Sequence, residues 1–133
     1  MIPSHSQTLS TEVFLPPRKE FCVTLGPNTD QWKTPVSEAM TLWSDPRSKV
    51  HYSMYPACPP VSTMVSVTTG GNPDCDSYSG YAGKNKYTEF VVFNEKCNLN
   101  VSQRNMLAIH EFGHVSGVEH TTATKDVMNA NAW

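Results

Sequence analysis

Three histidines and one glutamate near the end of the sequence have the types and spacing of a metal centre. Residues 110–120 read H-E-F-G-H-V-S-G-V-E-H, which is the pattern H-E-x-x-H-x-x-G-x-x-H. His110 and His114 are four residues apart, so on an α-helix both imidazoles lie on one face and reach a single Zn²⁺. Gly117 adopts the left-handed conformation at little cost, so the helix can end there and His120 can return to the same metal. Three histidine ligands leave the fourth position of a tetrahedral zinc open for water, as in catalytic rather than structural sites.

Glu111 follows the first histidine and leaves the helix about 100° further round. From there its carboxylate reaches a metal-bound water without being a ligand. We therefore predict one catalytic zinc, held by His110, His114 and His120, with Glu111 as the catalytic general base. The alternative is a helix whose histidines are ordinary surface or core residues, and it leaves the glycine and the returning histidine unexplained.

The same eleven residues resemble the zinc signature of the metzincin metallopeptidases. The run A-I-H-E-F-G-H at residues 108–114 looks most like the matrixin (matrix metalloproteinase) branch. Met128 falls where metzincins place the methionine of the Met-turn, a tight turn beneath the zinc. The resemblance is strong over about residues 101–129. It implies an α+β fold of the metzincin type: a mixed, mostly parallel, twisted sheet of about five strands with a backing helix and an active-site helix.

The resemblance also implies an activity. It predicts a zinc-dependent endopeptidase acting on a peptide or protein, in which Glu111 assists attack of water on the scissile carbonyl and passes the proton to the leaving amine. Two other interpretations stay open. One is a zinc amidase acting on a non-protein amide, such as a cell-wall cross-link. The other is a non-catalytic zinc-binding module.

The chain departs from the matrixin pattern in three respects. It has no histidine between His51 and His110, so we expect the structural zinc that matrixins hold on an H-x-D set to be absent. We also expect the further C-terminal helix of matrixins to be absent. The chain also contains no inhibitory cysteine of the P-R-C-G type, so we expect that any propeptide was removed or never existed. A propeptide-free protease endangers its host, which favours export or an inhibitor protein as a partner.

The composition fits one folded domain. The chain has 133 residues, of which 38% are hydrophobic and 17% are charged, and this length suits a single core. We expect residues 1–19 to form an extended or disordered arm and residues 20–133 to form a single, monomeric, metzincin-like catalytic domain. The net charge of −2 offers no basic surface to nucleic acid or to an anionic membrane. No apolar run approaches the roughly 20 residues of a membrane span.

An even number of cysteines in a short chain predicts disulfides. The four are Cys22, Cys58, Cys75 and Cys97, and two disulfides would indicate an oxidising, extracellular compartment. Three pairings are possible, and we favour Cys75–Cys97 because both residues flank the same strand region. The alternative is four reduced thiols in a cytosolic protein. We expect secretion, although residues 1–19 contain no apolar signal-peptide core.

Hydrophobic periodicity and turn residues predict the remaining elements. The first helix should have Thr34 as its N-cap and end near Trp43, and the active-site helix should begin at Ser102 and end near Ser116. Strands are expected at residues 20–25, 49–55, 61–69 and 87–93, with an antiparallel edge strand at 78–82.

The polar loop at residues 70–86 contains three side chains with hard oxygen ligands, Asn72, Asp74 and Asp76. Such ligands suit Ca²⁺, so this loop is a candidate calcium site. Simple turn chemistry is the alternative, and it is the one we favour.

Overall fold

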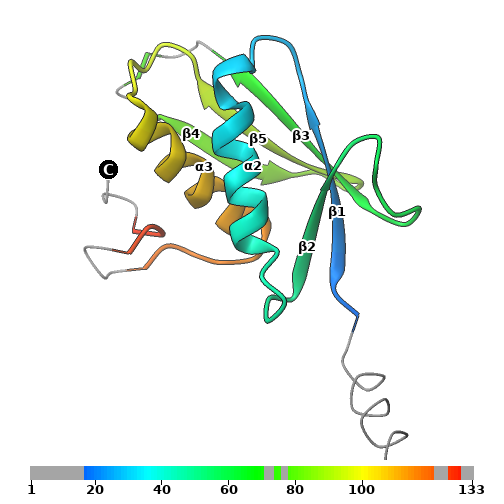
Figure 1. Ribbon diagram of the computed structural model, residues 1–133. Helices are drawn as coiled ribbons and strands as arrows, with labels where there is room; N and C mark the ends of the chain where they lie inside the picture. The colour runs from blue at the N-terminus through cyan, green and yellow to red at the C-terminus, as the bar shows by residue number, and fades with distance from the viewer. Residues whose placement is uncertain (1–16, 71–73, 76–77, 122–125, 130–133) are drawn as a thin grey trace, which may run out of the picture.

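In the computed structural model, a five-stranded sheet carries two α-helices, α2 and α3, side by side on one face (Figure 1). The structure describes residues 17–70, 74–75, 78–121 and 126–129. The elements in chain order are β1 (Lys19–Leu25), the 3-10 turn η1 (Asp30–Trp32), α2 (Lys33–Trp43), β2 (Val50–Met54), β3 (Thr63–Gly70), β4 (Gly80–Lys84), β5 (Thr88–Asn94) and α3 (Val101–Val115). None of the described helices is long and apolar enough to cross a membrane.

The strand order in the sheet is β2-β1-β3-β5-β4. The first four of these strands run parallel to their neighbours, and β4 pairs antiparallel with β5 at one edge. The predicted mixed, mostly parallel sheet of five strands is therefore confirmed. The edge strand expected at residues 78–82 lies two residues later, at Gly80–Lys84. The strand expected from Val61 begins at Thr63, and Val61 itself is 91% exposed.

The core fills the space between the sheet and the two helices. Alternate residues of β1, β3 and β5 face the helices, as period-2 side-chain direction requires. The buried residues of these three strands that face the helices are Phe21, Val23, Val65, Val67, Val91 and Phe93. The buried helix residues include Val36, Ala39 and Met40 of α2, and Leu107, Ala108 and Phe112 of α3. Each buried Val, Leu, Met or Phe side chain contributes about 1.5–3 kcal/mol, so this layer fixes α3, with its histidines, against the sheet.

Helix α2 begins one residue before the predicted cap. Trp32 occupies the N-cap position without a side-chain hydrogen bond, so Thr34 is not the cap. Trp32 is buried and stacks on Phe93 of β5, with ring centroids 3.8 Å apart. This tertiary contact sets the start of the helix and overrides the local capping preference. Pro35 still lies in the first turn, where its missing N–H costs nothing.

Helix α3 also begins earlier than predicted. Asn100, not Ser102, is its N-cap: the Asn100 side chain accepts a hydrogen bond from Gln103 N (2.8 Å), and the Gln103 side chain accepts one from Asn100 N (3.0 Å). This reciprocal capping box satisfies two backbone donors that the first turn would leave unpaired. Val101, the first residue of the helix, is 62% exposed.

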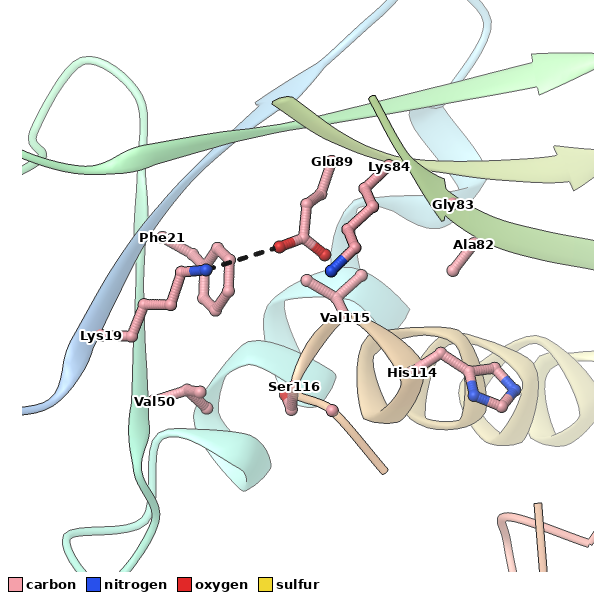
Figure 2. A pocket seen from close by; sticks show the side chains of 11 residues that line it. Lys19, Phe21, Val50, Ala82, Gly83, Lys84, Glu89, His114, Val115 and Ser116 are labelled. Carbon is pink, nitrogen blue, oxygen red and sulfur yellow. Dashed lines mark ion pairs between the residues drawn. The ribbon is translucent and has the colours of Figure 1, made fainter. Parts of the chain in front are cut away.

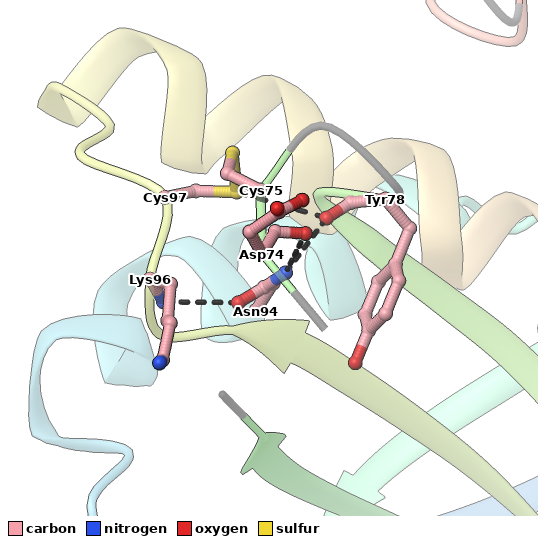
Figure 3. Close-up of a disulfide and its surroundings, with 6 residues drawn as sticks. All are labelled: Asp74, Cys75, Tyr78, Asn94, Lys96 and Cys97. Carbon is pink, nitrogen blue, oxygen red and sulfur yellow. Dashed lines mark hydrogen bonds between the residues drawn. A yellow bond between two sulfur atoms is a disulfide. The ribbon is translucent and has the colours of Figure 1, made fainter. Parts of the chain in front are cut away.

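Two disulfides, Cys22–Cys58 and Cys75–Cys97, close loops around the sheet. The second is the pairing that the sequence favoured. Figure 3 shows the buried Asn94 beside it. Asn94 Nδ2 donates to the carbonyls of Asp74 (3.3 Å) and Tyr78 (2.9 Å), and Asn94 Oδ1 accepts from Lys96 N (2.9 Å). These hydrogen bonds hold the segment that precedes β4 against the end of β5.

The candidate calcium ligands lie largely beyond what the structure describes. Asn72 and Asp76 are outside the described residues. Asp74 is exposed, and its backbone carbonyl accepts the hydrogen bond from Asn94. The backbone of Asp74 therefore helps to hold the loop before β4 against Asn94.

The capping box at the start of α3 gives the first testable prediction. Asn100→Ala removes the cap and should lower the free energy of unfolding by about 1 kcal/mol. Ser102→Ala alters an exposed position inside the first turn and should change it by less than about 0.5 kcal/mol. Urea denaturation of the two variants measures both effects, and an equal loss in Ser102→Ala would contradict the observed cap.

Candidate metal centre

The three motif histidines converge at the C-terminal half of α3. Their ligand nitrogens all lie within 4.8 Å of one another. His120 Nε2 is 3.1 Å from His110 Nε2 and 3.1 Å from His114 Nε2. Two nitrogens on a tetrahedral zinc, each at about 2.0–2.1 Å from the metal, would lie about 3.3 Å apart. The observed spacing therefore fits a three-histidine metal site.

Backbone carbonyls fix the orientation of two of the three imidazoles. His110 Nδ1 is 2.7 Å from Val127 O, and His114 Nδ1 is 2.9 Å from Val118 O. A carbonyl only accepts, so each Nδ1 carries the hydrogen and each Nε2 presents a lone pair in the neutral ring. Both lone pairs point toward His120 Nε2. That nitrogen carries at most one hydrogen, so it can donate to only one of the two lone pairs. A cation at the centre satisfies all three nitrogens, and this donor set suits zinc.

The electrostatics of the group favour the metal-binding form of the ring. Burial lowers the pKa of His110, the two neighbouring imidazoles act in the same direction, and the Val127 carbonyl opposes them. The lowered pKa keeps His110 neutral over a wider pH range. Neutral imidazole is the form that binds a metal.

Glu111 lies next to the cluster but outside it. Its carboxylate is not part of the group of converging ligand atoms. The residue is 3% exposed, and burial raises the pKa of Glu111 to about 7. Among the described residues, no hydrogen bond to this carboxylate is present. A buried carboxylate without a partner is costly, so its position within a metal motif points to a functional role.

Gly117 ends α3 with φ +95°, as the sequence predicts. Gly117 N donates to His114 O (3.0 Å) and Val118 N donates to Gly113 O (2.9 Å), which is the pattern of a Schellman motif. The turn therefore aims the Val118 carbonyl back at the His114 ring. It also reverses the chain so that His120 reaches the cluster.

A second turn, at residues 126–129, lies against α3. Asp126 Oδ1 accepts from Met128 N (2.8 Å), and Asp126 O accepts from Asn129 N (2.9 Å). Met128 is buried and lies against Gly113, between the first two histidines. The same turn supplies the Val127 carbonyl that orients His110. The structure thus places Met128 against the part of α3 that carries His110 and His114.

Two residues that sequence reasoning did not assign to the site also hold α3 in place. Trp43 Nε1 donates to Ile109 O (2.9 Å), one residue before the first ligand. Tyr52 Oη is 2.8 Å from Ser116 Oγ, which donates to Phe112 O at 2.8 Å. Their aromatic character predicted burial, but no sequence signal identified the carbonyls that they reach.

His51, the fourth histidine among the described residues, has a different partner. His51 Nδ1 is 2.6 Å from Glu20 Oε1 on the neighbouring strand β1. His51 does not belong to the three-histidine group.

Comparison of the chain with protein-family models and with curated proteins found no match. The resemblance to metzincins therefore rests on the motif residues themselves.

Gly113 provides a test of how closely the Met128 turn and Trp43 must approach α3. A Cβ at Gly113 would lie 2.8 Å from Trp43 Cζ2 and 2.9 Å from Met128 Cε. Gly113→Ala should therefore lower the free energy of unfolding by about 1–3 kcal/mol and weaken zinc binding, because the displaced turn carries the Val127 carbonyl.

Gly117→Ala is the matched control. A Cβ there would meet nothing within 4 Å, so only the positive φ costs stability, by about 1–2 kcal/mol. Denaturation and competitive zinc titration of both variants compare the two positions. Zinc binding by Gly113→Ala that equals the wild type would show that the close approach is dispensable.

Proposed function

We propose that this protein is a zinc-dependent endopeptidase. The observation that carries the proposal is the convergence of three imidazole nitrogens, two of them fixed by backbone carbonyls, beside a buried glutamate. Three protein ligands leave a fourth position for water, which is the arrangement of catalytic zinc. A structural site would have no need of an unpaired carboxylate at Glu111.

Each residue has a defined role in the proposed reaction. His110, His114 and His120 would hold the metal, and the carbonyls of Val118 and Val127 orient two of these rings. Zinc, when bound, would activate water and polarise the scissile carbonyl. The Glu111 carboxylate accepts a proton from the attacking water and passes it to the leaving nitrogen as the peptide bond breaks.

The edge strand β4 favours a peptide over a small amide as the substrate. Among the described strands β4 pairs with β5 alone, and it lies beside α3 (Figure 1). An extended peptide can add to such an edge through main-chain hydrogen bonds. This would hold a peptide along the sheet edge next to the three histidines.

Secretion belongs to the same proposal. The two disulfides fit an oxidising, extracellular-type environment, because reducing compartments keep thiols free. An exported protease also acts outside the cell that makes it, which limits damage to the host.

Cleavage of an unstructured protein tests the proposal. We expect about one zinc per chain and cleavage of casein that a chelator abolishes and zinc restores. Glu111→Gln should retain zinc but lose at least about 100-fold in activity, because the proton acceptor is gone. Glu119→Gln removes an equal charge from an exposed position of the same motif and should leave activity unchanged. Bound zinc without cleavage would contradict an endopeptidase and favour an amidase or a non-catalytic module.

A further inference from the structure

A pocket of about 390 Å³ lies at the end of α3 that carries His114 (Figure 2). It lies between the C-terminal end of α3, the end of the edge strand β4 and the first residues of β1 and β5. His114 lines the pocket and also contributes its Nε2 to the three-histidine group. The pocket and the candidate metal centre therefore have His114 in common, although its imidazole points away from Lys84 and Glu89 (Figure 2).

The pocket combines an apolar interior with charged residues. Phe21, Val50 and Val115 line it and are almost fully buried. Its charged residues are Lys19, Lys84 and Glu89. Apolar surface next to charge suits a side chain that carries an ionised group on a short aliphatic stem.

The charges of the pocket do not cancel. Lys19 Nζ is 3.9 Å from Glu89 Oε2, and Figure 2 shows the Lys84 side chain reaching toward the same carboxylate. The Glu89 side chain is only 13% exposed, whereas that of Lys19 is 56% exposed. Two lysines against one glutamate leave a net positive charge, and a zinc ion beside His114 would add to it. An anionic group is therefore favoured over a cationic one.

The pocket also lies on the expected path of a substrate. Ala82, Gly83 and Lys84 line it, and they are the last three residues of β4. A peptide added to the outer edge of β4, with its reacting bond at the three histidines, would pass over this pocket. A side chain near the reacting bond could then enter it.

We propose that this pocket is a specificity subsite that accepts an acidic side chain of the peptide substrate. Lys84 and Lys19 bind the carboxylate, and the apolar lining contacts the methylene groups. Glu89 holds the two ammonium groups together when no substrate is bound. The inference rests on the proposed peptidase function and adds a preference for Asp or Glu at one position near the cleaved bond.

The test is a cleavage profile on a peptide library made by digesting denatured proteins. Mass spectrometry reads which residues surround each cleaved bond, for the zinc-loaded wild type and for Lys84→Glu, Lys84→Gln and Lys86→Glu. Lys86 is exposed and does not line the pocket, so Lys86→Glu makes the same charge change as Lys84→Glu elsewhere on the surface. Lys84→Gln removes the charge without placing two glutamates opposite each other on β4 and β5.

The wild type should show enrichment of Asp and Glu at one position. Lys84→Gln should weaken this enrichment, and Lys84→Glu should replace it with Lys and Arg at the same position. On a peptide with Glu at that position, Lys84→Glu should lower kcat/KM about tenfold relative to the wild type. Lys86→Glu should match the wild type in both measurements.

Two results would overturn the inference, and they differ in what they say about the proposed function. Peptide cleavage with no acidic enrichment, or with an enrichment that Lys84→Glu leaves intact, removes the subsite and retains the peptidase. Failure of the zinc-loaded wild type to cleave any peptide removes both.

Discussion

Two hydrogen bonds from imidazole rings to backbone carbonyls determine what this site can do. Val127 O accepts from His110, and Val118 O accepts from His114, so both rings turn their Nε2 lone pairs inward. Without these bonds the rings could rotate or exchange tautomers, and three nitrogens would not converge on one point. Each carbonyl comes from a turn that follows α3. The candidate metal centre therefore depends on where those turns lie, as well as on the helix that carries the first two histidines.

The remainder of the fold holds α3 and the two turns that follow it in place. Trp43 of α2 contacts the helix at Gly113 and donates to Ile109 O, while Met128 contacts Gly113 from the second turn. A glycine at this position lets both neighbours approach at the level of the ligands. The five-stranded sheet supplies the surface on which the helices pack, and its edge strand β4 lies alongside α3. The same architecture forms the charged pocket, because β1, β4 and β5 all end or begin beside the last turn of α3.

Local patterns predicted the parts of the site that depend on local geometry. Helical spacing places His110 beside His114, and a positive φ is accessible to Gly117, so the cluster follows from eleven residues. Alternating apolar residues likewise predicted the strands. Contacts between segments that are far apart in the sequence were not predicted. Trp32 begins α2 because it stacks on Phe93, Asn100 replaced Ser102 as the cap of α3, and the Val127 carbonyl reaches His110 across 17 residues. The pocket at Lys84 and Glu89 depends on the pairing of β4 with β5, and the alternation of apolar residues along one strand does not say which strand it pairs with.

X-ray absorption at the zinc edge tests the central claim most directly. With one equivalent of zinc, the wild type should show three imidazole ligands and one oxygen ligand, with metal–nitrogen distances of about 2.0–2.1 Å. His120→Ala should reduce the imidazole count to two, and His51→Ala, which alters a histidine paired with Glu20, should leave it at three. Sulfur ligation, fewer than three imidazoles in the wild type, or a spectrum that His120→Ala leaves unchanged would contradict a zinc centre built on His110, His114 and His120.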